Sequence, residues 1–183
     1  MDLRVLKTKE ALRNALLLLL KEKQLGAISV TEICKVAMVN RGTFYSHYGR
    51  VEDLFEEYFK KMMEDLGASY EEPYKHMELL KAKELKPKSI RIFHHIEKYQ
   101  PFYRIVFSKG APLSYYYLFF DHIQTLMQAD MEKRHRATID IPMVSAYQAN
   151  AIVGLAIEWY RQDFQQTAEE MNETFVRILR GEE

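Results

Sequence analysis

Apolar residues recur along this chain every three or four positions, which is the spacing of one face of an α-helix. The first such stretch covers about residues 6–24, where Leu12, Leu16 and Leu19 share a face. Residues 51–67 carry a wider apolar face, since paired apolar residues return there every four positions. Long alternating strand patterns and Asn-Gly or Asp-Gly hairpin turns are absent from the sequence. The pattern therefore predicts an all-α protein.

Two short helices are expected between these longer ones. Ser29 and Glu32 form a capping box, in which each residue bonds the backbone amide of the other, and this predicts a helix over residues 30–37. Asn40 is a favourable N-cap for a third helix over residues 41–47. A helix of that length is unstable by itself in water, so its neighbours must hold it in place.

A tight turn between two short helices that pack on a longer one is typical of a DNA-binding helix-turn-helix. The apolar residues fit a small core between the three helices, made of Ile33, Ala37, Val39, Phe44 and Tyr48. With these packed inward, the side chains left nearer the outer side are those of Arg41, Thr43, Tyr45, Ser46 and His47.

Helical patterns resume after a charged, poorly periodic stretch at residues 67–87. They predict further helices at about 88–99, 101–108, 112–135, 142–164 and 168–180. The expected architecture is an N-terminal three-helix helix-turn-helix domain plus a C-terminal helical bundle, with about nine helices in all. We expect the helix-turn-helix domain in residues 1–50, a connecting helix at 51–66, and a sensing and dimerisation domain at 67–183.

Charge is unevenly distributed along a chain whose formal net charge is zero, with 26 basic and 26 acidic residues among 183. Residues 1–50 contain nine Lys and Arg against four Asp and Glu, which gives +5, and the remainder carries −5. A basic head on an acidic body indicates a nucleic-acid-binding end.

The stretch Asn40 to Tyr48, Asn-Arg-Gly-Thr-Phe-Tyr-Ser-His-Tyr, closely resembles the tetracycline-repressor (TetR) family. That family has a small residue or Gly, then Phe or Leu, Tyr, any residue, His, and Phe or Tyr. The flanks Thr31-Glu32-Ile33 and Glu52-Asp53-Leu54-Phe55 match at the family's spacing, so the resemblance is specific over about residues 5–66. Beyond that it is looser, although residues 150–159 look like the penultimate helix of one Gram-positive branch.

The resemblance implies which residues meet DNA. Arg41 would reach a guanine edge with its two-pronged guanidinium, and Thr43 would touch a thymine methyl or a phosphate. Tyr45 and His47 would hold phosphates, which fix register without reading sequence. The full set of implied DNA-binding residues is Ser29, Thr31, Asn40, Arg41, Gly42, Thr43, Tyr45, Ser46, His47 and Arg50.

Two positions depart from the family pattern. Met38 stands in the turn where many members have Gly, and a left-handed backbone there would cost Met roughly 1–2 kcal/mol. We therefore expect a slightly different turn. Val51 stands where many members have a Lys that holds a phosphate, with Arg50 as the candidate substitute.

The same resemblance implies a small-molecule site and a dimer in the C-terminal part. Aromatic residues could line an apolar pocket, although simple core packing explains at least half of them. The pocket candidates are Phe93, Phe102, Tyr103, Phe107, Tyr116, Tyr117, Phe120 and Trp159. Small residues in the last two helices permit the close approach of a four-helix dimer interface, with candidates Tyr147, Ala151, Gly154, Leu155, Phe175, Ile178 and Leu179.

No catalytic, metal-binding or cofactor-binding pattern stands out, so we expect neither an enzyme nor a cofactor. His94 and His95 are adjacent and point to different helix faces, which does not suit a metal ion. Cys34 is the one cysteine, so no intramolecular disulfide can form, and we expect a buried, inert thiol. The apolar run Leu16 to Leu20 is too short to span a membrane and no signal peptide is recognised, so a cytoplasmic location is expected.

The leading hypothesis is therefore a homodimeric transcriptional regulator that binds an inverted-repeat operator in double-stranded DNA. It would be a repressor released by an unidentified small-molecule effector. The alternative is a helical interaction protein, or a co-activator with a degenerate DNA-binding head. Met38, Val51 and the modest charge of the head leave this alternative open.

Overall fold

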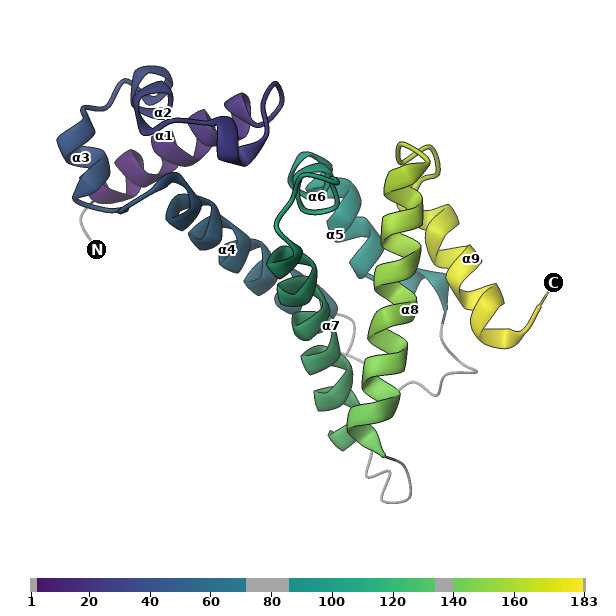
Figure 1. Ribbon diagram of the computed structural model, residues 1–183. Helices are drawn as coiled ribbons and strands as arrows, with labels where there is room; N and C mark the ends of the chain where they lie inside the picture. Colours follow the sequence, from purple (N-terminus) through teal and green to yellow (C-terminus); the bar gives the residue numbers. More distant parts are fainter. Residues whose placement is uncertain (1–2, 72–85, 134–139, 183) are drawn as a thin grey trace. The chain divides into compact units, whose positions relative to one another are not determined.

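A computed structural model describes residues 3–71, 86–133 and 140–182 (Figure 1). Within these ranges the chain forms nine α-helices and two short 3-10 helices, and contains no strand. This confirms the all-α prediction. The chain divides into two compact units, one of residues 1–62 with 108–111, and one of residues 63–107 with 112–183.

The first unit contains a three-helix head. Its elements are α1 (Leu3–Leu19), the 3-10 helix η1 (Leu25–Ala27), α2 (Val30–Ala37) and α3 (Arg41–Tyr45). Helix α1 packs against α2, and α2 packs against α3. Of the predicted small core, Ile33, Phe44 and Tyr48 are buried, whereas Ala37 and Val39 are half-buried. Leu12 and Leu16 of α1 are completely buried as well.

The first helix ends at Leu19, not near residue 24 as its apolar period suggested. The chain then turns through single hydrogen bonds, from Lys21 N to Leu18 O and from Lys23 N to Leu19 O. Leu25 and Ile28 after the turn are buried. Burying these two side chains requires the chain to fold back early, and this long-range requirement is invisible in the helical period.

The turn between α2 and α3 contains Met38, the residue that departs from the family pattern. Met38 has φ 55° and ψ 41°, the left-handed conformation that favours glycine. Its side chain is 93% exposed, so it disturbs no packing. Val39 N donates to Cys34 O at 3.0 Å and closes the end of α2. Met38 therefore takes a backbone conformation that suits glycine, at a local cost of about 1–2 kcal/mol.

Helix α4 (Val51–Glu71) contributes residues to both units. The sequence predicted an end near Gly67, but the helix continues through this glycine. A side chain at Gly67 would begin 3.5 Å from His122 Nε2, so the position lies against the imidazole of another helix. Packing therefore sustains the helix past a residue that weakens helices in isolation. The remainder of the predicted irregular stretch, 72–85, lies outside the described residues.

The second unit consists of the end of α4 and five further helices. These are α5 (Ile92–Lys98), α6 (Gln100–Val106), α7 (Leu113–Lys133), α8 (Ile141–Arg161) and α9 (Ala168–Arg180), with the 3-10 helix η4 (Pro87–Ser89) before α5. Helices α7 and α8 run antiparallel, since Tyr116 bonds Asn150 while Gln124 bonds the carbonyl of Pro142. Helix α9 packs on α5 and η4. Residues 134–135, predicted as the end of α7, lie outside the described residues.

Two boundaries in this unit differ from the prediction by more than two residues. Helix α5 begins at Ile92 rather than residue 88, because the 3-10 turn and the extended Ile90 precede it. Helix α8 ends at Arg161 rather than 164, because Asp163 and Phe164 both have positive φ, 57° and 54°. Phe164 is buried with its ring 5.1 Å from that of Trp159. Burial of this aromatic side chain holds a backbone conformation that bulky residues rarely adopt.

A buried histidine links α5 to its neighbours. His95 Nδ1 lies 3.0 Å from the hydroxyl of Tyr103 on α6, and its Nε2 lies 3.3 Å from Asp65 Oδ2 on α4, without hydrogen-bond geometry. Burial lowers the pKa of His95 to about 4, and the nearby Lys98 also lowers it, whereas Asp65 acts in the opposite direction. His95 is therefore neutral in the folded protein at pH 7.

Acidification should destabilise the protein through His95. Between its ordinary pKa of 6.5 and its folded value of about 4, the unfolded chain binds a proton that the folded protein does not. The stabilisation is complete above pH 6.5 and decreases as the pH falls toward 4, by roughly 3 kcal/mol in total. Denaturant unfolding of the wild type and His95→Gln across this range isolates the effect. Parallel pH profiles of the two proteins would contradict this assignment.

Candidate nucleic-acid interface

Helix α3 begins at a well-formed cap. Asn40 Oδ1 accepts hydrogen bonds from Thr43 N at 2.7 Å and from Thr43 Oγ1 at 2.9 Å. The hydroxyl of Ser46 donates to Thr43 O at 2.8 Å and closes the other end. These bonds satisfy backbone groups that a five-residue helix cannot pair internally. The cap occupies the oxygen of Asn40, so any hydrogen bond that this side chain donates must come from its amide Nδ2.

The side chains of α3 divide into one buried and one exposed set. Phe44 is completely buried, whereas Tyr45 is 50% exposed and Arg41 is also exposed. Arg41 Nη2 lies 3.4 Å from the hydroxyl of Tyr45, and its guanidinium lies 5.8 Å from the centre of the Tyr45 ring. The two side chains, one turn apart, therefore extend over the same outer face of the helix.

Tyr48 anchors the end of the recognition segment in a way that the sequence did not reveal. Its hydroxyl donates to Glu57 Oε1 at 3.0 Å, and Lys9 on α1 contacts Glu57 Oε2 at 2.6 Å. Burial, together with the bond to Glu57, raises the pKa of Tyr48. Burial alone would raise the pKa of Glu57, but the bonds from Lys9 and Tyr48 outweigh it and lower that pKa. The contact joins α1, the segment after α3, and α4.

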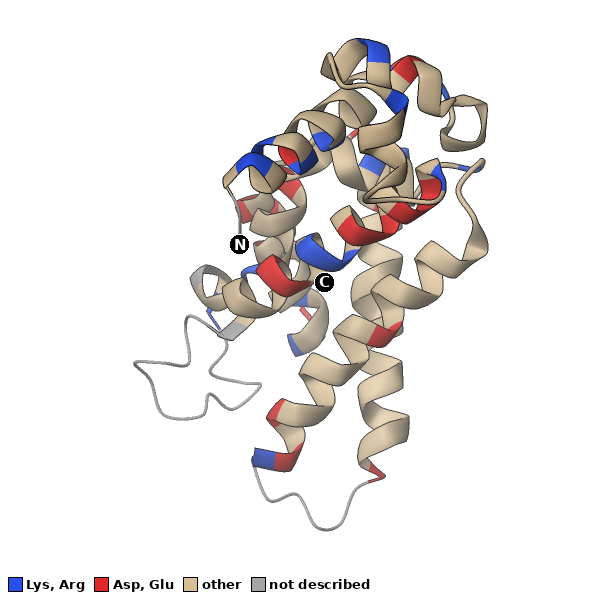
Figure 2. Cartoon of the chain, turned by 90° about the vertical axis from the view of Figure 1, so that its left-hand side faces the viewer, with Lys and Arg blue, Asp and Glu red and all other residues tan. Residues whose placement is uncertain are grey.

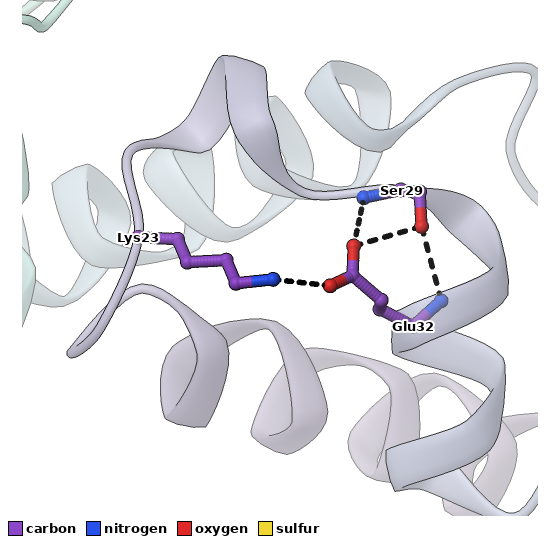
Figure 3. Close-up of polar contacts among 3 residues, drawn as sticks. All are labelled: Lys23, Ser29 and Glu32. Carbon is purple, nitrogen blue, oxygen red and sulfur yellow. Dashed lines mark hydrogen bonds and ion pairs between the residues drawn. The ribbon is translucent and has the colours of Figure 1, made fainter.

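The start of α2 is held by the predicted capping box, extended by a third residue (Figure 3). Glu32 accepts from Ser29 N at 2.9 Å and from Ser29 Oγ at 2.8 Å, and Lys23 pairs with its other oxygen. The bond from Lys23, followed by those from Ser29, lowers the pKa of Glu32 to about 2. The hydroxyl proton of Ser29 is thus engaged by Glu32, whereas the neighbouring Thr31 is exposed.

Val51, which departs from the family pattern, is the first residue of α4, and its candidate substitute Arg50 directly precedes it. Val51 is buried, so its side chain cannot take over the phosphate contact of a lysine. Arg50 is exposed, but its Nε lies 2.9 Å from Asp53 Oδ1 and its Nη2 lies 3.9 Å from Glu56 Oε1. Arg50 must leave these carboxylates to meet a phosphate, which weakens it as a substitute.

The structure therefore gathers most of the predicted DNA-binding residues around α3. Tyr45, Arg41, Gly42, Ser46 and Asn40 are exposed there, while Thr43 and His47 are half-buried. Ser29 and Thr31 lie at the start of α2, and Arg50 lies before α4. Lys and Arg outnumber Asp and Glu in the head, although both kinds occur there, whereas α7 and α8 carry few charged residues over most of their length (Figure 2).

The predicted pocket residues form two groups of aromatic contacts, one around Tyr103 and one made of Tyr116, Tyr117 and Phe120. Phe93, Phe102, Tyr103 and Trp159 are buried, and Phe107, Tyr116 and Phe120 are half-buried. The ring of Tyr103 lies 5.5 Å from that of Phe107 and 5.4 Å from that of Phe119. Tyr117 is 53% exposed. A pocket among these residues stays a prediction.

The predicted dimer residues offer an apolar surface. Tyr147, Ala151 and Gly154 are exposed along α8, as are Ile178 and Leu179 on α9. Leu155 and Phe175 are half-buried. A side chain at Gly154 would meet no atom within 4 Å, so glycine leaves room there for a close approach.

Three further observations concern other classes of site. In the described part of the chain, no group of three or more His, Cys, Asp or Glu is placed to hold a metal ion. Cys34 is buried as predicted, and burial raises the pKa of its thiol. Within the described helices, none is long and apolar enough to cross a bilayer.

Comparison with known proteins gives a consistent set of similarities. The TetR C-terminal family model, a transcriptional regulator C-terminal region, matches residues 83–181, which is more than half of the chain. An uncharacterised HTH-type transcriptional regulator of Bacillus subtilis (strain 168) is 22% identical over 153 residues. That match covers 82% of this chain, but the chain spans only 39% of the relative.

Two solved structures share the fold over nearly the whole chain. One, from Syntrophomonas wolfei and assigned to the TetR family, has a TM-score of 0.77 at 16% identity and covers 94% of this chain and 93% of that one. The other is the Thermus thermophilus repressor FadR in complex with lauroyl-CoA. It has a TM-score of 0.62 at 17% identity and covers 95% and 94% of the two chains.

A helix-turn-helix head followed by an all-helical C-terminal region defines a class of transcriptional regulators. Within that class, this chain belongs to the TetR family of transcriptional regulators.

Proposed function

We propose that the protein binds double-stranded DNA through α3 and regulates transcription as a homodimer on an inverted-repeat operator. The observation that carries the proposal is the division of α3 into a buried Phe44 and an exposed face with Arg41 and Tyr45. A short helix braced from behind, with polar groups outward, suits insertion into a major groove.

Gly42 supports the same proposal. A side chain at this position would meet only Asn40 Oδ1, at 3.4 Å, which is an ordinary contact. The backbone of Gly42 also avoids positive φ, so the fold itself does not require a glycine. An external surface that approaches the helix backbone closely would require one, as a DNA duplex does in this proposal.

Homodimerisation would use the apolar surface of α8 and α9. Tyr147 on α8 is 76% exposed and Ile178 on α9 is 57% exposed, so both helices carry large apolar side chains that a partner could cover. A second copy related by a two-fold axis would cover both surfaces at once. The resulting dimer presents two copies of α3, as an operator with two half-sites requires.

We further propose that a small-molecule effector binds in the second unit and releases the protein from DNA, as in a repressor. The FadR relative, a repressor solved with lauroyl-CoA, is the precedent for a ligand in this fold. The aromatic network around Tyr103 supplies the apolar surroundings that such a ligand needs. Helix α4 contributes residues to both units, so we expect it to transmit a movement of the second unit to the first.

Two single substitutions in α3 distinguish recognition of the base sequence from binding of phosphates. Arg41→Ala should lose preference between base sequences, by about 1–3 kcal/mol at the contacted position. Tyr45→Phe should weaken binding to all duplexes alike, because a phosphate contact carries no sequence information. Binding to a random-sequence duplex pool, followed by sequencing of bound and free DNA, measures both effects. Wild-type behaviour of both variants would reject α3 as the DNA-binding element and favour a helical interaction protein.

A further inference from the structure

The segment between α6 and α7 is packed differently from the helices that it joins. Residues 108–111 belong to the compact unit that contains the head, whereas Phe107 and Pro112 on either side belong to the other unit. Ala111 N donates to Ser108 O at 3.0 Å and makes the segment a tight turn. The chain thus passes from the second unit into the first and back within a few residues. We call residues 108–111 the α6–α7 turn.

Gly110 is the point of closest approach in this turn. A side chain built at Gly110 would begin 2.9 Å from both Cδ and Nε2 of Gln24 and 3.0 Å from its Oε1. The flat amide of Gln24 therefore lies where a side chain would stand. Gly110 has no positive φ, so its conformation is open to other residues and the contact with Gln24 is what favours glycine.

Gln24 lies one residue from the ion pair that holds the start of α2. Its carbonyl accepts from Ala27 N at 2.9 Å and opens η1, which the buried Leu25 fixes to the head. The preceding residue, Lys23, pairs with Glu32, the carboxylate of the capping box (Figure 3). A shift of the turn at Gln24 therefore moves the cation that steadies the first turn of α2.

We propose that Gln24 and Gly110 are positioning residues for DNA binding, through which the α6–α7 turn sets the orientation of the start of α2. This inference rests on the proposed function and deepens it, because it adds a route for regulation. Movement of α6 or α7 reaches the head at Gln24 and passes through Lys23 and Glu32 to Ser29 and Thr31. The route is separate from the one along α4.

The test uses the full chain and small substitutions that the fold tolerates. Gly110→Ala should displace the Gln24 amide, which is the end of a flexible, exposed side chain, so global unfolding should stay unchanged. Gly26→Ala is the matched control, because a side chain there would meet nothing within 4 Å although it lies two residues from Gln24. Gln24→Ala removes the contact from the other side.

Hydrogen exchange at the amides of Glu32 and Ile33 reports on the start of α2. We expect exchange about fivefold faster in Gly110→Ala and in Gln24→Ala, with Gly26→Ala like the wild type. The double variant should match each single one, since both remove one contact. Affinity for a random-sequence duplex pool should fall by about the same factor, with an unchanged salt dependence.

Two results would overturn the inference: equal exchange in Gly110→Ala and Gly26→Ala, or effects of Gln24→Ala and Gly110→Ala that simply add. Exchange is measured without DNA, so it is independent of the proposed function. If the wild type fails to bind duplex DNA, the proposed function fails, and the DNA-positioning role fails with it. If the wild type binds and exchange does not respond, only the positioning role is overturned.

Discussion

Replacing Phe44 with alanine should unfold the recognition segment and abolish DNA binding. Phe44 is completely buried and contacts Tyr48, with ring centres 5.7 Å apart. Removing a buried phenyl group costs about 3–5 kcal/mol. Because α3 has only five residues, it has no stability of its own with which to compensate.

Hydrogen exchange of residues 41–48 measures this loss locally, where a global unfolding curve would mix the two units. Phe44→Leu is the matched control, since it keeps most of the buried apolar volume and should retain DNA binding with a smaller loss of protection. Exchange protection in Phe44→Ala equal to that of the wild type would show that the core of the head does not depend on this ring.

Introducing charge into the proposed dimer surface should have a comparably large effect. In Tyr147→Asp combined with Ile178→Asp, each carboxylate would lose its water on association without gaining a partner. Burying an unpaired charge costs several kcal/mol. We therefore expect the dimer dissociation constant to rise at least about 100-fold, or ~3 kcal/mol, and operator affinity to fall with it.

Sedimentation velocity over a range of protein concentrations measures the dissociation constant. Leu113→Asp is the matched control, because Leu113 is 67% exposed but lies on α7, outside the proposed interface. If the double variant forms a dimer as stable as that of the wild type, the interface lies elsewhere. If Leu113→Asp weakens the dimer equally, the effect of added charge is not specific to the surface of α8 and α9.

Sequence signals located helix starts that have a side-chain cap better than they located helix ends. The capping box at Ser29 gave the start of α2, because a cap is a local arrangement of side chain and backbone. The end of α8 depends on burial of Phe164 against Trp159. The continuation of α4 through Gly67 depends on packing against His122. Such long-range contacts are not encoded in a local period.

The candidate site was predictable to a similar extent. The outward face of α3 follows from its period and from the buried Phe44. The sequence did not predict that Arg50 pairs with Asp53 or that Tyr48 bonds Glu57, because each contact depends on how the side chains are placed in the folded head. The contact between Gly110 and Gln24 joins residues far apart in sequence and left no local signal at all.

The central claim is that the exposed face of α3 meets a DNA duplex. A salt titration of duplex affinity tests it most directly, because each phosphate that the protein neutralises releases counterions. The logarithm of the binding constant should fall linearly with the logarithm of salt concentration, with a slope of about −0.9 for each phosphate contacted. In Tyr45→Phe the affinity should fall without a change of slope, because the lost hydroxyl carries no charge. Affinity that does not change with salt, or no binding to duplex DNA at low salt, would contradict the claim.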